Sequence, residues 1–214
     1  ADSAVRETAL ECLQDGQTQI IEIDLDDEVL GVGMPCGGKM EVYVEPFLPQ
    51  PELMLVGQGR IAELVAELGR LLHFRVTGNS SAATRDDFPF ADQLITDDTE
   101  YQKIKPGLHS YVIVLTQHKG DQQVIQAALR GAPRYIGLVA SAKRSRLVVE
   151  YLKEGGMDAD ALRRVLRAPC GLDLGGRTPE EIALSIITAP TALARRPLPL
   201  RLPRMPIDRS TAVQ

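Results

Sequence analysis

The feature that most constrains the fold is an alternation of strand-like and helix-like segments after residue 51. It follows the segment Pro46-Phe-Leu-Pro-Gln-Pro51, whose three prolines can continue neither a helix nor a central strand and therefore mark a linker. Beyond this linker, strands are predicted at 53–56, 74–77, 93–96, 111–115 and 135–139, and helices at 60–72, 122–130, 142–154, 158–166 and 179–188. Such alternation predicts parallel strands joined by right-handed crossovers. We expect an α/β fold with a Rossmann-like, doubly wound parallel sheet.

A smaller α+β segment precedes the linker. A helix is predicted at 4–13 and strands at 17–24, 29–33 and 39–45, the last because its residues alternate with the period of a half-buried strand. At the other end, residues 190–206 are rich in proline and lack a hydrophobic period, so we expect an extended arm. The predicted organisation is therefore an N-terminal segment at 1–47, a Rossmann-like domain at 48–192 and an Arg/Pro-rich tail at 193–214.

Composition narrows the class of protein. The chain is 44% hydrophobic and 25% charged, and no apolar run approaches the ~18 residues of a membrane span, so we expect a cytoplasmic protein that does not contact a membrane. The net charge of −5 argues against nucleic-acid binding. The three cysteines, Cys12, Cys36 and Cys170, are too few and too scattered for a disulfide scaffold, which favours a reducing compartment.

A glycine turn lies between the first strand and the first helix of the predicted sheet. Gly57-Gln-Gly59 would direct backbone N–H groups and the positive end of the helix toward a phosphate. An NAD site also needs Asp or Glu about 20 residues after the first glycine, whereas this chain reads Val76-Thr-Gly-Asn-Ser80. The pattern favours a phosphate- or nucleotide-bearing ligand over classical NAD binding. The alternative is an unoccupied turn that only packs the sheet.

Polar residues follow two further strands at their carboxyl ends, where open α/β sheets bind ligands. Thr116 and His118 follow the strand at 111–115 and are candidates for hydrogen bonds to a ligand. Asp121 is next in this loop, and we interpret it preferentially as the N-cap of the following helix.

Ser141 closes the segment that ends the strand at 135–139. Lys143, Arg144 and Arg146 come soon after it. A hydroxyl with clustered cations suits an anionic ligand. The alternative is a capped helix with a solvated basic first turn, which the helix dipole disfavours.

Cys36 is the most reactive candidate before the linker. It lies in Met34-Pro-Cys-Gly-Gly-Lys39, where the glycines let the backbone approach a partner and Lys39 would lower the pKa of the thiol. We predict a reactive thiol or metal ligand, with a buried inert cysteine as the alternative. Cys12 has the setting of an apolar helix residue, whereas Cys170 lies in a loop that could reach the same cleft.

The start of the last predicted helix is strongly marked. Thr178 suits the N-cap, Pro179 the first helical position, and Glu181 the capping-box position.

These motifs together resemble the XdhC/CoxI family, the xanthine dehydrogenase accessory proteins that assist maturation of molybdenum hydroxylases. The resemblance covers roughly residues 30–190. It is carried by Cys36-Gly-Gly38 with its following strand, by the glycine turn and the Thr116–Asp121 loop, and most specifically by Tyr135–Ser141 and Gly171-Leu-Asp-Leu-Gly-Gly-Arg-Thr-Pro-Glu-Glu-Ile-Ala183.

The resemblance implies a protein that binds the molybdenum cofactor, as molybdopterin or its dinucleotide form, and hands it to an apo molybdenum hydroxylase after a cysteine desulfurase supplies sulfur. It places Cys36 near the metal or sulfur. The residues expected to line the cofactor cleft are Gly57, Gly59, Thr116, His118, Ser141, Gly171, Asp173 and Arg177. A homo-oligomer is also expected.

Two departures from the family pattern stand out. Family members usually begin with an additional strand-turn-strand unit that carries a Gly-Ser-x-x-Arg pattern, so the N-terminal segment is expected to be incomplete. Cys170 occupies a position where the family has an aliphatic residue. The sequence favours a non-catalytic maturation factor and cofactor chaperone. The alternatives are an NAD(P)-dependent oxidoreductase and a nucleotide-sensing regulatory module without chemistry.

Overall fold

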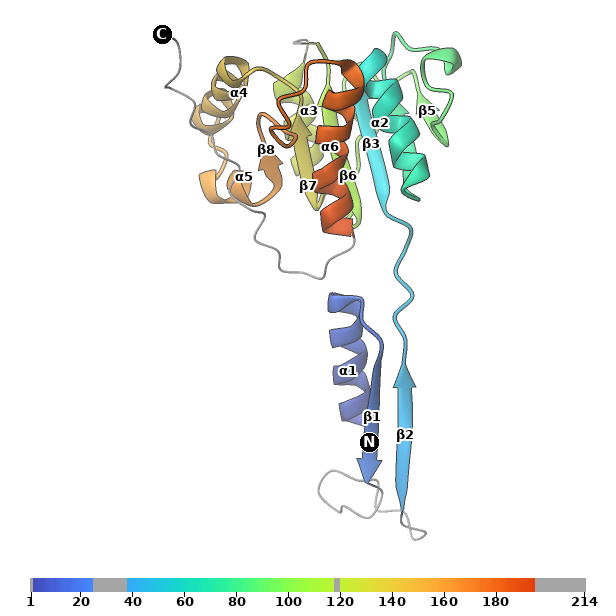
Figure 1. The fold of residues 1–214 in the computed structure, drawn as a ribbon. Coiled ribbons are helices and arrows are strands. Elements are labelled where there is room, and N and C mark those ends of the chain that lie inside the picture. Colours follow the sequence, from blue (N-terminus) through green and yellow to red (C-terminus); the bar gives the residue numbers. More distant parts are fainter. Residues whose placement is uncertain (1, 25–37, 118–119, 195–214) are drawn as a thin grey trace. The chain divides into compact units, whose positions relative to one another are not determined.

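The computed structural model describes residues 2–24, 38–117 and 120–194, which divide into two compact units on either side of residue 50 (Figure 1). The smaller unit contains helix α1 (Asp2–Asp15) and the antiparallel strands β1 (Gln19–Asp24) and β2 (Lys39–Val44). Cys12 of α1 is fully buried, as expected of an apolar helix residue. The strand predicted at 29–33 lies outside the described residues.

The larger unit is built on a six-stranded sheet of order β5-β4-β3-β6-β7-β8, in which every neighbouring pair is parallel. The strands are β3 (Glu52–Gly57), β4 (Arg75–Asn79), β5 (Gln93–Ile95), β6 (Ser110–Leu115), β7 (Tyr135–Leu138) and β8 (Leu166–Arg167). This order confirms the Rossmann-like, doubly wound fold. The strand order reverses between β3 and β6, which is the point where such sheets bind ligands.

Helices cover both faces of this sheet (Figure 1). They are α2 (Arg60–Leu71), α3 (Asp121–Leu129), α4 (Ala142–Glu154), α5 (Ala159–Val165) and α6 (Pro179–Ala194), with a short 3₁₀ turn η1 (Arg85–Asp87). Met54, Val112 and Ile136 of the central strands pack in one core with Val124 of α3 and Val148 of α4. On the opposite face, α2 packs closely enough that Gly69 leaves no room for a side chain beside Leu53 and Val76.

One expectation about the elements is wrong, and one strand was missed. Residues 190–194 continue α6 and are not an extended arm, although Pro190 lies inside the helix. Buried Ile186, Ile187 and Leu193 hold this segment against the core, so packing compensates for the backbone hydrogen bond that proline removes. The two-residue strand β8 was not predicted, because two residues carry no periodicity.

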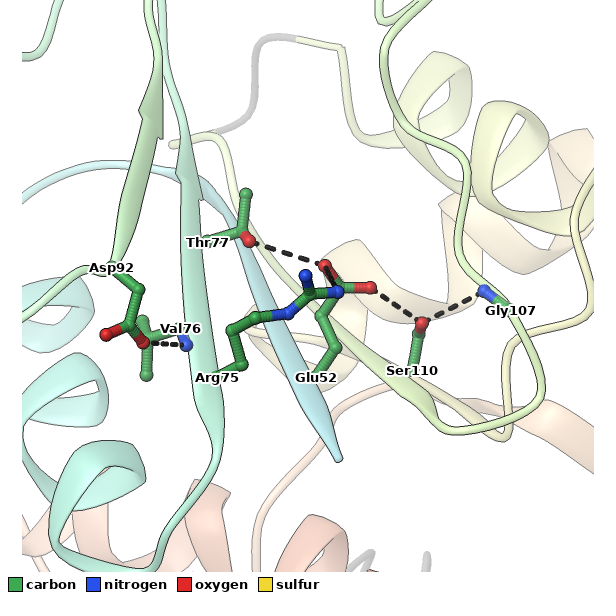
Figure 2. A network of polar contacts seen from close by, with 7 residues as sticks. All are labelled: Glu52, Arg75, Val76, Thr77, Asp92, Gly107 and Ser110. Carbon is green, nitrogen blue, oxygen red and sulfur yellow. Dashed lines mark hydrogen bonds and ion pairs between the residues drawn. The ribbon is translucent and has the colours of Figure 1, made fainter. Parts of the chain in front are cut away.

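The amino end of the sheet is held together by the carboxylate of Glu52 (Figure 2). It accepts hydrogen bonds from the hydroxyl of Ser110 at 2.8 Å and of Thr77 at 3.4 Å, and it pairs with Arg75 at 3.2 Å. A hollow of about 350 Å³ lies beside this network. Because these bonds join β3 to both neighbouring strands, we assign Glu52 a structural role.

None of the helices that the structure describes has the length and apolar character needed to cross a bilayer.

Candidate ligand site at the carboxyl edge of the sheet

The glycine turn ends β3 and begins α2. Gly57 has φ +120°, and a Cβ built on it would lie 2.2 Å from the carbonyl oxygen of Leu115 in β6. Gly59 is the N-cap residue of α2, with φ +108° and no side-chain cap. The turn therefore leaves the backbone groups at the start of α2 uncovered by side chains at these two positions, which is the arrangement that phosphate-binding turns use.

Thr116, at the end of β6, is held by a buried carboxylate. Asp121 is 2% exposed, and its carboxylate accepts a short hydrogen bond from the Thr116 hydroxyl and a 3.1 Å bond from Nε of Arg144. The interpretation of Asp121 as an N-cap is wrong, because Gly120 occupies that position and Asp121 is the first residue of α3. Asp121 instead connects the end of β6 to α4. His118 lies outside the described residues.

Ser141 is the N-cap of α4, and its hydroxyl accepts the N–H of Arg144 at 3.3 Å. Lys143 and Arg146 are exposed, and neither forms an ion pair with any residue that the structure describes. Three cations thus lie within the first five residues of α4, and one of them, Arg144, pairs with Asp121. This is a favourable location for an anion.

The start of α2 has a different charge balance. Arg60 pairs with Glu63 at 2.9 Å and with Glu180 of α6 at 3.4 Å, so two carboxylates face one guanidinium. The Arg60–Glu180 pair also brings the amino ends of α2 and α6 together. The start of α4 is therefore more positive than the start of α2.

The loop from Gly171 to Arg177 reaches the same edge through Cys170, whose N–H bonds to the Leu138 carbonyl at the end of β7 at 2.9 Å. Gly171 has φ +97° and lies against Ser185 of α6, where a Cβ would come within 2.6 Å of the hydroxyl. Asp173 accepts a bond from the Gly175 N–H, and the side chains of Asp173 and Arg177 are exposed.

The start of α6 has the predicted capping box. The Glu181 N–H donates to the Thr178 hydroxyl at 3.2 Å, and the Glu181 carboxylate accepts the N–H groups of Thr178 and Arg177 at 3.0 and 2.8 Å. These backbone bonds, that of Thr178 first, lower the pKa of Glu181 from its ordinary value. The backbone N–H of Arg177 is therefore bonded within the cap of α6.

Cys36 and Cys170 are the two cysteines for which the sequence suggested a role. Cys36 lies outside the described residues. Cys170 is half-buried beside Gly137 and Tyr135. Burial raises the pKa of its thiol to about 12, so the thiol stays protonated at neutral pH and is a poor nucleophile. Within the described ranges, no group of three or more His, Cys, Asp and Glu residues could hold a metal ion.

The end of β4 carries no carboxylate, as the sequence indicated. Asn79 is 1% exposed and its amide donates to Asp98 at 2.8 Å, while the Ser80 hydroxyl donates to the side chain of Gln58 at 2.9 Å. Sequence reasoning missed Gln58 and Ser80 as partners, and also the Asp121–Arg144 pair. Such side-chain contacts depend on tertiary packing and leave no periodic signal.

The carboxyl edge of the sheet thus brings together five sequence-predicted residues, Gly57, Gly59, Thr116, Ser141 and Gly171. Asp173 and Arg177 lie on the exposed part of the loop that follows Gly171.

Comparison with known proteins places this edge in a family context. The family model described as the XdhC Rossmann domain matches residues 53–189. An uncharacterized Escherichia coli protein, YqeB, is 27% identical over 164 residues, which is 73% of this chain and 30% of that protein. A Bacillus subtilis protein, named as one probable subunit of xanthine dehydrogenase, is 31% identical over 154 residues, 68% of this chain and 44% of that protein. The chain therefore spans less than half the length of these curated relatives.

A solved structure supports the fold. The crystal structure of a xanthine dehydrogenase from Bacillus halodurans superposes with a TM-score of 0.56 at 24% identity, covering 73% of this chain and 47% of that one.

Proposed function

Because the chain belongs to the family of the XdhC Rossmann domain, we propose that it is an accessory protein of a molybdenum hydroxylase of the xanthine dehydrogenase type. In this proposal it binds the molybdenum cofactor as cargo, and assists its sulfuration and its insertion into the apo-enzyme. The B. subtilis relative, whose name makes it part of a xanthine dehydrogenase, supports a hydroxylase as the partner. A cysteine desulfurase as sulfur donor, a homo-oligomeric state and a cytoplasmic location are further parts of the proposal.

The observation that carries the proposal is the cluster of cations at the start of α4, which follows β7, one strand away from the point where the strand order reverses. Lys143, Arg144 and Arg146 follow the N-cap Ser141 at the carboxyl end of β7. The molybdenum cofactor is a pterin with an anionic phosphate or nucleotide tail, and such a tail suits three cations and an N-terminal helix dipole.

The glycine turn fits the same ligand. Gly59 carries no side chain, which leaves the backbone at the start of α2 accessible to a bulky group, whereas the missing side chain of Gly57 makes room for the Leu115 carbonyl of β6. The residues of this chain would thus bind and orient the cofactor, with Lys143 and Arg146 facing the anionic tail and Thr116 beside the turn.

Cofactor retention tests the proposal. The full chain is purified without oxygen, incubated with molybdenum cofactor and desalted, and the molybdenum and pterin retained are measured. We expect Lys143→Glu with Arg146→Glu to lower retention at least about tenfold, since two favourable charge contacts become repulsive. Lys153→Glu, on the last turn of the same helix, is the matched control and should retain as much as the unmodified protein. No retention by the unmodified protein would contradict the proposal.

An NAD(P)-dependent oxidoreductase is the second candidate, favoured by the strand order and the glycine turn. Against it stands the end of β4, where Asn79 and Ser80 occupy the position at which NAD enzymes hold a carboxylate for the ribose. Tight NAD(P) binding together with hydride transfer would favour this candidate over the accessory role.

A further inference from the structure

The side chain of Gln58 spans part of the carboxyl edge that is open in dinucleotide-binding domains. In those domains the first ribose lies between the glycine turn and the end of the second strand, where its hydroxyls bond to an acidic side chain. Here the corresponding positions are Gly57–Gly59 and Asn79–Ser80. The Ser80 hydroxyl donates to Oε1 of Gln58 at 2.9 Å, so a hydrogen bond crosses the place of the ribose.

Both residues of this bond form a second hydrogen bond through their own backbone groups. The Ser80 N–H donates to the carbonyl of Ile95 in β5 at 3.0 Å. The carbonyl of Gln58 accepts a bond from the Gln117 side chain at 3.4 Å, and Gln58 and Ser80 are both half-buried. A ribose would have to break the Gln58–Ser80 bond and displace the half-buried side chain of Gln58.

The carboxylate that Asn79 contacts, Asp98, cannot replace the missing acid. Asp98 is 5% exposed, and it accepts bonds from the Asn79 amide at 2.8 Å and from the N–H groups of Gln102 and Lys103 at 2.7 and 3.0 Å. Turning it toward a ligand would leave three buried or half-buried donors without their acceptor, which is costly.

The charges at the starts of α2 and α4 also disfavour an anionic ligand on the β4 side of the edge. The pair of carboxylates, Glu63 and Glu180, outweighs Arg60 at the start of α2, whereas cations outnumber carboxylates at the start of α4. An anionic group therefore meets a more favourable field on the β7 side of the edge than on the β4 side.

We propose that Gln58 and Ser80 determine ligand specificity by closing the first nucleoside subsite of this Rossmann domain. The carboxyl edge then accepts ligands whose anionic group lies toward α4, and it rejects dinucleotides that need a ribose between the glycine turn and β4. The inference rests on the proposed function only for the identity of the ligand that does bind; the rejection of NAD-type ligands follows from the residues themselves.

The test is to open the subsite. Binding of NAD and of ADP-ribose to the full chain is measured by calorimetry for the unmodified protein, for Gln58→Ala, and for Gln58→Ala combined with Ser80→Asp. The double variant removes the bridging side chain and supplies the carboxylate that ribose hydroxyls need. Ser81→Ala, next to Ser80, and Gln123→Ala, on α3, change similar residues at exposed positions and are matched controls.

We expect the double variant to bind both ligands at least about tenfold more tightly than the unmodified protein, because the ribose hydroxyls then donate hydrogen bonds to a charged carboxylate. Gln58→Ala alone should give a smaller gain, and the controls none. Thermal unfolding confirms that each variant is folded. If the double variant fails to fold, Gln58→Ala alone decides the matter.

Two results would overturn the inference: tight NAD binding by the unmodified protein, or a folded, opened variant with no gain. Molybdopterin, measured in parallel, separates this inference from the proposed function. A protein that gains NAD binding when opened but never retains molybdopterin supports the closed subsite and contradicts the cofactor role. A protein that retains molybdopterin and also binds NAD in its unmodified form supports the role and contradicts the closed subsite.

Discussion

Gly57 shows how strongly a single residue can be fixed by its neighbours. Its φ of +120° disfavours any side chain, and a Cβ would lie 2.2 Å from the Leu115 carbonyl oxygen, a rigid backbone atom. We expect Gly57→Ala to lower the free energy of unfolding by at least about 2 kcal/mol, from backbone strain and overlap together. Urea unfolding measures this. Gly107→Ala is the control, because no atom lies within 4 Å of a Cβ there, and equal effects at both positions would contradict the expectation.

Asp121 is the second residue whose substitution we expect to lower the free energy of unfolding strongly. Its side chain is 3% exposed and pairs with Arg144, so Asp121→Asn removes a buried negative charge that faces a partly buried guanidinium. We expect a loss of about 2 kcal/mol in the free energy of unfolding, less than for a fully buried pair because Arg144 is partly solvated.

The control for this change is Asp160→Asn. Its partner Arg163 is closer, at 2.6 Å, but both side chains are more than two-thirds exposed, and exposed pairs contribute little. A loss at Asp121 no greater than that at Asp160 would show that the buried pair does not stabilise the fold.

Individual site residues were predictable where the backbone decides their type. The glycines of the turn fall in this class, because their positions follow from the strand–turn–helix pattern. Side-chain partners were not predictable: Gln58 meets Ser80 across 22 residues and Asp121 meets Arg144 across 23. Those contacts arise from tertiary packing, which also decided against the N-cap interpretation of Asp121.

At the scale of elements, the cap at the start of α6 can be tested by a single substitution. Thr178→Ala removes the hydroxyl that accepts the Glu181 N–H, and loss of such a cap typically costs about 1 kcal/mol. Urea unfolding at neutral pH should show this loss. Thr84→Ala, in the separate box that starts η1, removes a similar hydroxyl from a single-turn helix and should cost less.

The same cap makes stability depend on pH. The pKa of Glu181 is lowered in the folded protein by the N–H groups that its carboxylate accepts. The stabilisation from this carboxylate is therefore fully present above its ordinary pKa of 4.5 and is lost as the pH falls through the lowered value. We expect Glu181→Gln to flatten the pH dependence of unfolding below pH 4.5, measured in urea. An unchanged slope would contradict this assignment.

Most elements were predicted to within two residues because their hydrophobic periods are clear. The strand at 111–115 and the helix at 142–154 are examples, observed at Ser110–Leu115 and Ala142–Glu154. Failures occurred where local rules and packing disagree. Pro190 indicates the end of a helix, yet the buried side chains of Ile187 and Leu193 on either side of it keep α6 helical to Ala194.

At the scale of the whole molecule, alternation predicted the doubly wound parallel sheet, since right-handed crossovers leave few arrangements for such a chain, whereas the order of the strands came only from the structure. The division into two units followed from the prolines at 46–51. This connection predicts where proteolysis begins. Phe47 is 86% exposed in a segment without regular structure, and limited chymotrypsin digestion should first cut after it.

Mass spectrometry of the first fragments checks this cut. Leu48 precedes Pro49, a bond that the protease hydrolyses poorly, so Phe47→Ala should remove the early product. First cuts within the six-stranded sheet would contradict the expectation, because the buried strands should open only with global unfolding.

The close contact of Gly57 with Leu115 also bears on the rate of ligand capture. Because the glycine turn packs directly against β6, we expect its backbone to keep one conformation before a ligand binds. Association should then follow a single exponential whose observed rate rises linearly with ligand concentration, without the plateau that a slow prior rearrangement produces. Differences in residence time among ligands would then lie in their dissociation, governed by the side chains around the rigid turn.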